Sequence, residues 1–449
     1  MKNLIIIIFV FYTLIFPQSI DDSFYLIKYS EFNNINDYHL NFGYFDSDLI
    51  QNNIEFKLSI YNSIVNYNQQ FKDNNFLVFY NLANSINDKI NFELSTYIEN
   101  SKVQPVLNYS EYYNDEFNKF SGDINKAYLD YEYDNIALKI GRDYFLPGKY
   151  LYDRLLFSSN GHPYDQLVFT FIKNKVSISS FYLQLNSFEE ANVIYNRHLN
   201  GHRININLNN GYLALNEICI YGGENQNIHF PLLNPFNNIY IYQMNNKFNL
   251  NSILSLEYFF ENDKHSFFME FVLDDFQIDK KEPADLEPTE FAFLIDFSKS
   301  IGSSLKYNFN YTIISNRTFN APNNNYEKMI YKNFPIGHNL GNNFWKIENG
   351  LLLSNPKSIF YLRYIYIKKG DEALFSDFNM DYLDYDISEG YKEKFPFGNI
   401  SAMSGLVIDY HFLKNKKFNF NSSISYWFQS YLENSGFNFS VSAKYLFEL

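Results

Sequence analysis

The stretch G-F-N-F-S-V-S-A-K-Y-L-F-E-L, residues 436–449, decides the fold class of this chain. Apolar side chains occupy every second position from Phe437 onward, and most positions between them are polar. Successive side chains of a β-strand point to opposite faces, so one face of this stretch is apolar and the other is polar. The stretch therefore predicts a β-strand that separates an apolar from a polar environment.

The same alternation recurs along the chain, for example from Leu305 to Ile313, from Phe418 to Phe428 and from Ile204 to Leu208. We expect about eighteen antiparallel strands on this basis, with ends uncertain by a few residues. The predicted ranges are 52–66, 76–85, 88–99, 125–133, 135–142, 165–173, 175–184, 202–209, 211–221, 246–260, 265–275, 289–299, 302–314, 345–353, 357–368, 400–413, 416–429 and 436–449.

The predicted connections alternate between short and long. Turn-forming residues fill the short ones, at Asp134-Asn135, Asn174-Lys175, Asn209-Asn210, Asn262-Asp263-Lys264, Ser300-Ile301, Asn355-Pro356 and Lys414-Asn415. The long ones fall at 100–124, 143–164, 185–201, 222–245, 276–288, 315–344 and 369–399. A Greek-key sandwich would not keep this alternation through so many hairpins. It is typical of an all-β, up-and-down transmembrane barrel with short periplasmic turns and long extracellular loops.

The first 20 residues have the layout of a secretory signal peptide. A charged second residue precedes an apolar run from Leu4 to Phe16, and a proline and the small residue Ser19 follow it. We expect export with cleavage near Ser19, a periplasmic lead-in or partial plug over 21–51 and the barrel over 52–449. The rest of the chain has no run of ~18 apolar residues, so no spanning helix is expected.

The bulk composition fits a barrel in the outer membrane. Aromatic residues make up 20% of the chain, with 48 Phe and 40 Tyr, yet the mean hydropathy is -0.31. A barrel reconciles these values, because each strand gives one face to lipid and the other to a polar interior. The formal net charge of -14 argues against nucleic acid as a partner. Cys219 is the single cysteine, so no intrachain disulfide can form, and we expect it to pack as a small apolar residue.

No motif for a known enzyme chemistry emerges. The chain has no G-x-S-x-G, no H-E-x-x-H, no Gly-rich phosphate loop and no cysteine pair for zinc, and its 8 histidines are dispersed. The neighbouring carboxylates of Asp274-Asp275 and of Glu189-Glu190 would point to opposite faces of a strand, which disfavours a glycosidase pair. We therefore expect no enzyme, cofactor or metal.

Six segments carry a more specific signal. They read K-I-G-R-D-Y-F-L-P-G-K-Y-L-Y-D-R-L-L-F-S-S-N-G-H-P-Y-D (139–165), N-R-H-L-N-G-H-R (196–203), L-N-E-I-C-I-Y-G (215–222), L-L-N-P-F (232–236), M-E-F-V-L-D-D-F-Q-I-D (269–279) and N-F-P-I-G-H-N-L-G (333–341). In this order they resemble the capsule-assembly Wzi-type outer-membrane family, over roughly residues 125 to 345. Leu146 departs from the family pattern, which has an aromatic residue before the Pro-Gly turn.

The resemblance implies an outer-membrane barrel that takes part in capsule or extracellular polysaccharide assembly and surface attachment, as a lectin-like, non-enzymatic protein. Its partners would be outer-membrane lipids, the polysaccharide and the outer-membrane assembly machinery. Tyr445 and Phe447 resemble the closing-strand signal that this machinery reads, with Leu449 in place of the terminal aromatic. The family also has a helical periplasmic plug, for which residues 21–51 are short.

The candidate polysaccharide-binding or lumen-lining residues are polar groups in these segments and at strand ends. They are Arg142, Arg154, Asn160, His162, Arg203, Glu217, Asp274, Asp275, Arg317 and His338. Guanidinium groups could bind sugar carboxylates through their planar fork. Alternatively, the arginines pair with Asp143, Asp153, Glu217 or Asp275 inside a wet lumen.

Two other functions remain open on the sequence. A porin or substrate-specific diffusion channel would also have polar strand faces and long loops. An embedded hydrolase would need a Ser/His or carboxylate constellation, which the sequence does not assemble.

Overall fold

The computed structural model describes residues 55–448 with several segments left out. Those segments are 65–74, 88, 101–119, 150–153, 159–161, 191, 276–285, 323, 356–357, 372–373, 379, 386–392, 416–417 and 430–433. Within these limits, side chains are described from residue 89 to residue 410, without 97–100, 120 and 121. The predicted signal peptide, the lead-in over 21–51 and the side-chain alternation of 436–449 lie outside the described part.

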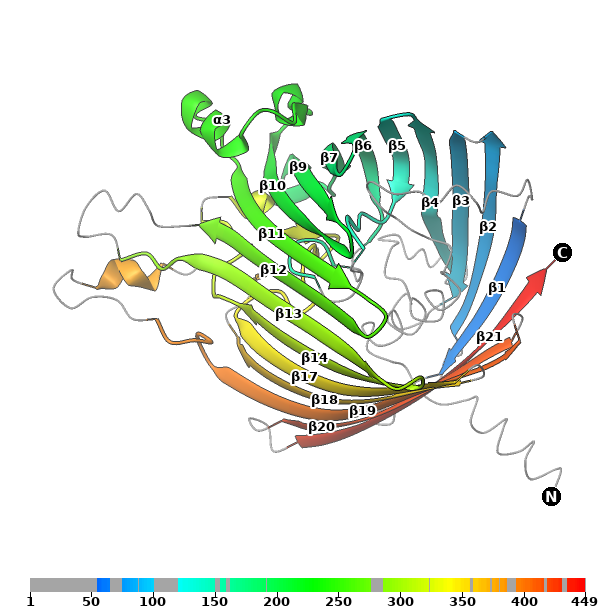
Figure 1. Cartoon of the computed structure of the whole chain (residues 1–449). Coiled ribbons are helices and arrows are strands. Elements are labelled where there is room, and N and C mark those ends of the chain that lie inside the picture. Colours follow the sequence, from blue (N-terminus) through cyan, green and yellow to red (C-terminus); the bar gives the residue numbers. More distant parts are fainter. Residues whose placement is uncertain are drawn as a thin grey trace, which may run out of the picture.

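One antiparallel sheet of 19 strands forms the wall of the molecule. Each long strand pairs with the next long strand of the chain, and β21 pairs with β1, so that the strands form a ring around a lumen (Figure 1). The strands are β1 (Glu55–Ile64), β2 (Asn75–Asn87), β3 (Ile90–Asn100), β4 (Phe120–Tyr133), β5 (Ile136–Asp143), β6 (Tyr164–Lys173), β7 (Val176–Gln184), β8 (Phe188–Glu190), β9 (Val193–Leu208), β10 (Gly211–Glu224), β11 (Asn251–Glu261), β12 (His265–Asp275), β13 (Glu290–Ile301), β14 (Leu305–Ile314), β17 (Phe344–Asn355), β18 (Ser358–Gly370), β19 (Ile400–Asn415), β20 (Phe418–Gln429) and β21 (Asn434–Glu448).

The predicted class, an all-β antiparallel up-and-down barrel, is confirmed. Each predicted strand range overlaps one long strand, in order. The additional strand is the three-residue β8, which pairs with the start of β9. A separate two-stranded sheet, β15 (Ile330–Tyr331) and β16 (Phe334–Pro335), lies in a long connection.

Tight turns join the strands at one end of the barrel, which we call the turn end. The predicted turns at Asp134-Asn135, Asn174-Lys175, Asn209-Asn210 and Asn262-Asp263-Lys264 are confirmed. Asp134 and Asn174 have left-handed backbone conformations, with φ 54° and 57°. Short Asp and Asn side chains tolerate this conformation, which explains why these residue types stand there.

Two predicted turns are displaced. Ser300 and Ile301 belong to β13, and the turn is formed by residues 302–304, where Gly302 has a left-handed backbone with φ 76°. Ile301 then pairs with Leu305. β19 continues through Asn415, so the predicted turn at 414–415 is part of a strand. Asn355 of the predicted Asn355-Pro356 turn is the last residue of β17, and Pro356 lies outside the described residues.

Long connections join the strands at the opposite end, which we call the loop end. They contain the 3-10 helices η3 (Phe230–Leu233), η4 (Asn325–Glu327) and η5 (Asp381–Asp384) and the helix α3 (Ile239–Asn246). The strand predicted over 246–260 begins only at Asn251, because α3 and its C-cap precede it. β9 begins at Val193, nine residues before its predicted start at 202.

The burial pattern of the wall is inverted relative to a water-soluble protein. Outward side chains such as Leu129, Phe171 and Leu213 are apolar and exposed, whereas inward side chains such as Thr170, Ser255 and Thr312 are polar and buried. This arrangement is that of a strand between lipid and a polar interior. Among the described residues, no helix is long and apolar enough to cross a membrane.

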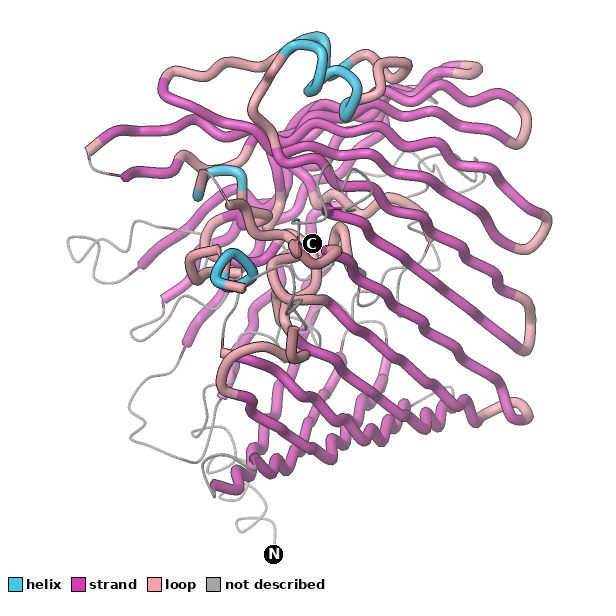
Figure 2. The backbone as a smooth tube through the Cα atoms, turned by 90° about the vertical axis from the view of Figure 1, so that its left-hand side faces the viewer, coloured by secondary structure: helices cyan, strands magenta, loops and turns pink. Residues whose placement is uncertain are grey.

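Two long connections fold back into the lumen. We call the described residues of 144–163, after β5, the first inner loop, and the described residues of 315–343, after β14, the second inner loop. Their apolar side chains are buried in one cluster with inward side chains of the wall, and Figure 2 shows loop segments among the strands in the middle of the barrel. Phe145, Leu155 and Phe157 come from the first inner loop, and Phe319 and Ile336 come from the second.

Candidate functional site

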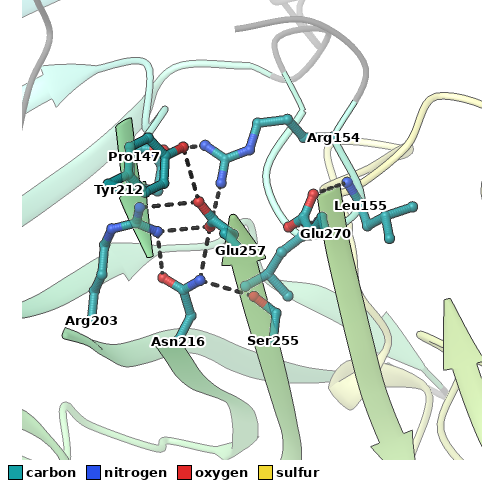
Figure 3. A network of polar contacts seen from close by, with 10 residues as sticks. Pro147, Arg154, Leu155, Arg203, Tyr212, Asn216, Ser255, Glu257 and Glu270 are labelled. Atoms are coloured by element: carbon teal, nitrogen blue, oxygen red, sulfur yellow. Dashed lines mark hydrogen bonds and ion pairs between the residues drawn. The ribbon is translucent and has the colours of Figure 1, made fainter. Parts of the chain in front are cut away.

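A buried network of polar side chains lies where the first inner loop meets the wall (Figure 3). Glu257 of β11 is at its centre and accepts hydrogen bonds from two nitrogens of the Arg203 guanidinium of β9, at 2.7 and 3.0 Å. Asn216 and Tyr212 of β10 donate to the same carboxylate at 2.8 and 3.2 Å. The paired bonds between guanidinium and carboxylate fix the orientation of both groups.

The first inner loop contributes the second cation of this network. Arg154 forms an ion pair with Glu257 and donates to the carbonyl of Pro147 in the same loop. The neighbouring amides of Leu155 and Leu156 donate to the Glu270 carboxylate of β12, at 2.7 and 3.2 Å. Buried charges are tolerated when they are paired and hydrogen-bonded, as here. The network therefore anchors the loop to the wall.

The second inner loop packs directly on the first. The amide of Ser158 donates to the carbonyl of Ile336 at 3.1 Å. At Gly337 a Cβ atom would lie 2.0 Å from the carbonyl oxygen of Leu155, so only glycine allows this approach. Next to this contact, Tyr331 of the second inner loop stacks on Tyr164, the first residue of β6, with ring centroids 4.8 Å apart. The two loops thus form one packed body inside the barrel.

A pair of tyrosines lies at the loop end of this body. Tyr195 of β9 and Tyr326 of η4 are stacked, with centroids 5.1 Å apart and an interplanar angle of 17°, and both rings are partly exposed. The buried guanidinium of Arg197 fixes the backbone beneath them, since it donates to the carbonyls of Tyr326 and Lys328, each at 2.7 Å. The pair is therefore a rigid aromatic surface.

The two candidate histidines, His162 and His338, are buried in the inner loops. The ring of His162 packs edge-on against Tyr331 and Phe334. Burial, aided by the charge of Lys332, lowers the pKa of His162 from 6.5 to about 3, so the ring is neutral. His338 packs against Phe344, and its Nδ1 accepts a hydrogen bond from the amide of Leu340 at 3.1 Å. Both rings contribute to the packing of the loops.

Glu327 of η4 is another buried titratable group of the inner loops. It accepts a hydrogen bond from Asn324 at 2.9 Å. Burial raises the pKa of Glu327 from 4.5 to about 7. Glu327 is not among the predicted candidates, because nothing in the local sequence pattern marks it as buried.

Arg142 is the most accessible of the candidate arginines. It lies on the outward face of β5, where it binds both oxygens of Asp165 at 2.8 and 2.6 Å and Asp123 at 3.3 Å. Asp143, one of the alternative partners of the arginines, does not pair with Arg142, because Asp143 points inward and binds Lys139 at 2.7 Å.

Glu217 is separated from the arginines by the wall. It lies on the outward face of β10, where it accepts hydrogen bonds from the amides of Ile239 and Tyr240 at 3.0 and 3.3 Å. Arg203 points inward to Glu257, so the alternative pairing of Arg203 with Glu217 is wrong. The alternation of strand side chains explains both placements.

The remaining candidates lie near the loop end of β12 and in the second inner loop. Asp274 accepts a hydrogen bond from the amide of Phe319, and Asp275 follows it at the end of β12. Arg317 is buried, with φ 63°, and forms an ion pair with Glu393 at 2.7 Å. Asn160 lies outside the described residues.

Sequence reasoning did not identify four residues of the buried network. These are Tyr212, Asn216, Glu257 and Glu270. The available signal was the period of two on β10 and β11, which places Asn216 and Glu257 on the inward face. It could not reveal their partners, because Glu257 lies 54 residues from Arg203 and Glu270 lies 115 residues from Leu155 in the chain.

No group of three or more His, Cys, Asp or Glu residues positioned to hold a metal ion occurs in the part of the chain that the structure describes. Some of the described polar groups that face the lumen, among them Glu257 and Glu270, hold the first inner loop in place. The loop end presents the aromatic pair and the wall presents the Arg142 guanidinium, which are groups suited to binding.

The comparisons with known proteins bear on the fold. No protein-family model matches the chain, and no curated protein matches it in sequence. Among solved structures, the chain is similar to Wzi of Escherichia coli, described as an outer membrane protein involved in group 1 capsule assembly and a carbohydrate-binding β-barrel. The TM-score is 0.61 at 13% identity, covering 96% of this chain and 90% of that one.

A porin and another outer membrane protein show the same architecture at lower similarity. A BenF-like porin from Pseudomonas fluorescens has a TM-score of 0.51 at 9% identity, covering 89% of this chain and 98% of the porin. The outer membrane protein opdK of Pseudomonas aeruginosa has a TM-score of 0.50 at 9% identity, covering 88% and 98%. At these identities the likeness shows the fold alone, which is that of outer-membrane β-barrels.

Proposed function

We propose that this chain is a non-enzymatic outer-membrane barrel that binds capsular or other extracellular polysaccharide at the cell surface. The observation that carries the proposal is the packed body of the two inner loops. The Arg154 network and the Gly337 contact hold the described residues of these loops in a folded core inside the barrel. A fixed core can present a binding surface. The similarity in fold to Wzi, which is described as a carbohydrate-binding β-barrel, agrees with this role.

The stacked pair Tyr195 and Tyr326 is the best-supported part of the binding surface. Partly exposed aromatic rings offer a flat apolar face for the C–H groups of a sugar ring. A tyrosine loses little conformational freedom on binding, and here Arg197 already fixes the backbone of Tyr326. Arg142 offers its guanidinium to a sugar carboxylate only in competition with Asp165.

The test uses the purified full-length barrel in detergent and measures binding of two probes by calorimetry, alginate as an acidic polysaccharide and dextran as a neutral one. We expect at least one to bind and Tyr326→Ala to weaken that binding several-fold. Tyr364→Ala is the control, since Tyr364 is exposed on the outer face of β18. Equal affinities of both variants, or no binding of either probe and of polysaccharide extracted from the native cell surface, would overturn the proposal.

A second function, a porin or substrate-specific channel, is favoured by the polar inward faces of the strands. Lys139, Lys346 and Asp409 are examples of charged residues on these faces. Planar-bilayer recordings separate the two functions. Stable open steps for the full-length protein would favour the channel, whereas a barrel whose inner loops stay docked has little conductance.

Export through a cleaved signal peptide and insertion by the outer-membrane assembly machinery are part of the same proposal. The N-terminal sequence of the mature protein, isolated from outer membranes, tests the cleavage near Ser19. Deletion of the last three residues tests the closing-strand signal, and we expect it to reduce insertion without reducing synthesis.

A further inference from the structure

One row of outward side chains on the barrel wall is apolar at both ends and polar in its middle. Successive strands β5, β6, β7, β9, β10 and β11 place one residue each in the row, paired in register. The residues are, in that order, Leu138, Phe169, Ser180, His202, Glu217 and Leu254. Phe169 and Leu254, on either side of the polar three, are each 41% exposed. Their exposure puts the row at the depth of the lipid-facing belt.

The three polar residues of this row are covered by one segment. We call residues 226–250, which contain η3 and α3, the outer cover. Ser180 donates to the carbonyl of Leu233 at 2.6 Å, and the ring of His202 donates to the carbonyl of Leu232 at 3.0 Å. Glu217 accepts from the first amides of α3, where the helix dipole also favours a negative charge. The cover is thus bound at the depth of the row.

The next two rows toward the loop end are covered in the same way. Cys219 and Tyr221 of β10 are completely buried in an apolar cluster with Leu232, Ile239 and Leu250 of the cover. This confirms the prediction that Cys219 packs as a small apolar residue. The cover therefore lies against the outside of β7, β9 and β10, and Figure 1 shows α3 outside the ring of strands.

The far side of the outer cover is strongly apolar. Phe236 is 83% exposed, Phe230 is 74% exposed and Ile241 is 58% exposed. Tyr240 and Met244 of α3 are also exposed. Such a concentration of exposed large apolar side chains in one short segment marks an interaction surface. It is continuous with the outward belt of the same strands, to which Ile204, Ile206, Leu213 and Leu215 contribute.

We propose that the outer cover lies in the outer leaflet of the membrane, where its exposed apolar side chains contact lipid acyl chains. The wall of β7, β9 and β10 is polar at this depth, and the cover replaces its missing lipid-facing surface. Backbone inside a membrane must be satisfied by the protein. Here α3 satisfies its own, Glu217 accepts from its first turn, and wall side chains bind the carbonyls of η3. This inference is independent of the polysaccharide proposal.

The test measures the accessibility of a nitroxide label to oxygen, which concentrates in lipid, and to a water-soluble nickel chelate. The full-length protein is reconstituted in phospholipid vesicles with Cys219→Ala as the background. Ile241→Cys and Phe236→Cys carry the label in the cover. Leu213→Cys of the outward belt is the lipid control and Asp381→Cys of η5 is the water control, since both side chains are exposed.

We expect the ratio of oxygen to nickel accessibility at both cover positions to match that at Leu213 and to exceed that at Asp381 several-fold. A ratio equal to that at Asp381 would place the cover in water and overturn the proposal. Low accessibility to both reagents, with dipolar broadening between labels, would assign the surface to a second copy of the chain and also overturn it. Met244→Cys, on the same exposed face, replaces Ile241→Cys should that variant fail to fold.

Discussion

The inner loops and the outer cover pack on opposite faces of the same strands by different interactions. On β9 and β10 the inward Arg203 and Asn216 take part in a network of side chains around one carboxylate. The adjacent outward residues, His202 and Glu217, bind backbone groups of the cover. Charged side chains can be paired inside a polar lumen. On the outward face, side chains of the wall instead form hydrogen bonds with backbone groups of the outer cover, whose own exposed side chains are largely apolar.

Among the substitutions that test this comparison, we expect Glu257→Ala to have the largest effect on stability. In Glu257→Ala, Arg154 and Arg203 lose the carboxylate that they share while remaining buried, so we expect a loss of about 3–5 kcal/mol in the free energy of unfolding. Urea unfolding of the protein in lipid vesicles measures this loss of free energy. We also expect faster amide hydrogen exchange at Leu155 and Leu156. Glu261→Ala, on the exposed turn end of the same strand, is the control. A loss no larger than that of the control would show that the network does not anchor the loop.

We expect the next largest effect on stability at the contact between the two inner loops. Gly337→Ala places a Cβ against the carbonyl of Leu155 and must separate the loops, at a cost of about 1–3 kcal/mol. Limited proteolysis is expected to cleave both inner loops faster. Gly223→Ala is the matched control, because a Cβ there meets no atom closer than 3.6 Å. If only the first inner loop were cleaved faster and the second stayed resistant to protease, the two loops would not form one packed body.

Acid is expected to loosen the first inner loop through His162. Its pKa is 6.5 in the unfolded chain and about 3 in the folded protein, so only the unfolded state takes up a proton between these values. The stability contributed by the neutral ring is complete above pH 6.5 and is lost progressively toward pH 3. Over this range the equilibrium constant for opening of the loop rises by up to about tenfold for each pH unit. Hydrogen exchange of residues 154–158 measures it, and His162→Gln should flatten this dependence.

The smallest effect is expected at the outer cover. Glu217→Ala removes the acceptor for the first amides of α3, at a cost of about 1 kcal/mol. The cover should be cleaved faster by protease in detergent, where lipid does not shield it, while hydrogen exchange of the inner loops stays unchanged. Glu224→Ala, exposed at the end of β10, serves as the control. A simultaneous change in the inner loops would show that the two faces of the wall are coupled.

The barrel could be predicted from the sequence because strand alternation and turn residues are local signals. The helix α3 could not. Its residues Ile239 to Tyr242 alternate Ile and Tyr, which favours a strand. The helix forms because Asn238 caps it and the distant Glu217 accepts from its first amides. Likewise, the position of Arg154 depends on carboxylates that the sequence places on other strands. Local patterns do not encode such long-range pairings.

The distance along the chain between Arg154 and its partner has a consequence for the order of folding. Arg154 lies 103 residues before Glu257 and belongs to a loop that also requires the second inner loop for its contacts. Docking of the first inner loop therefore requires β11, β12 and the second inner loop, which all follow it in the chain. Its docking must be a late event, after β11 to β14 have joined the wall. A folding barrel thus passes through a stage in which the strands up to β14 are paired and the Arg154 network has not yet formed.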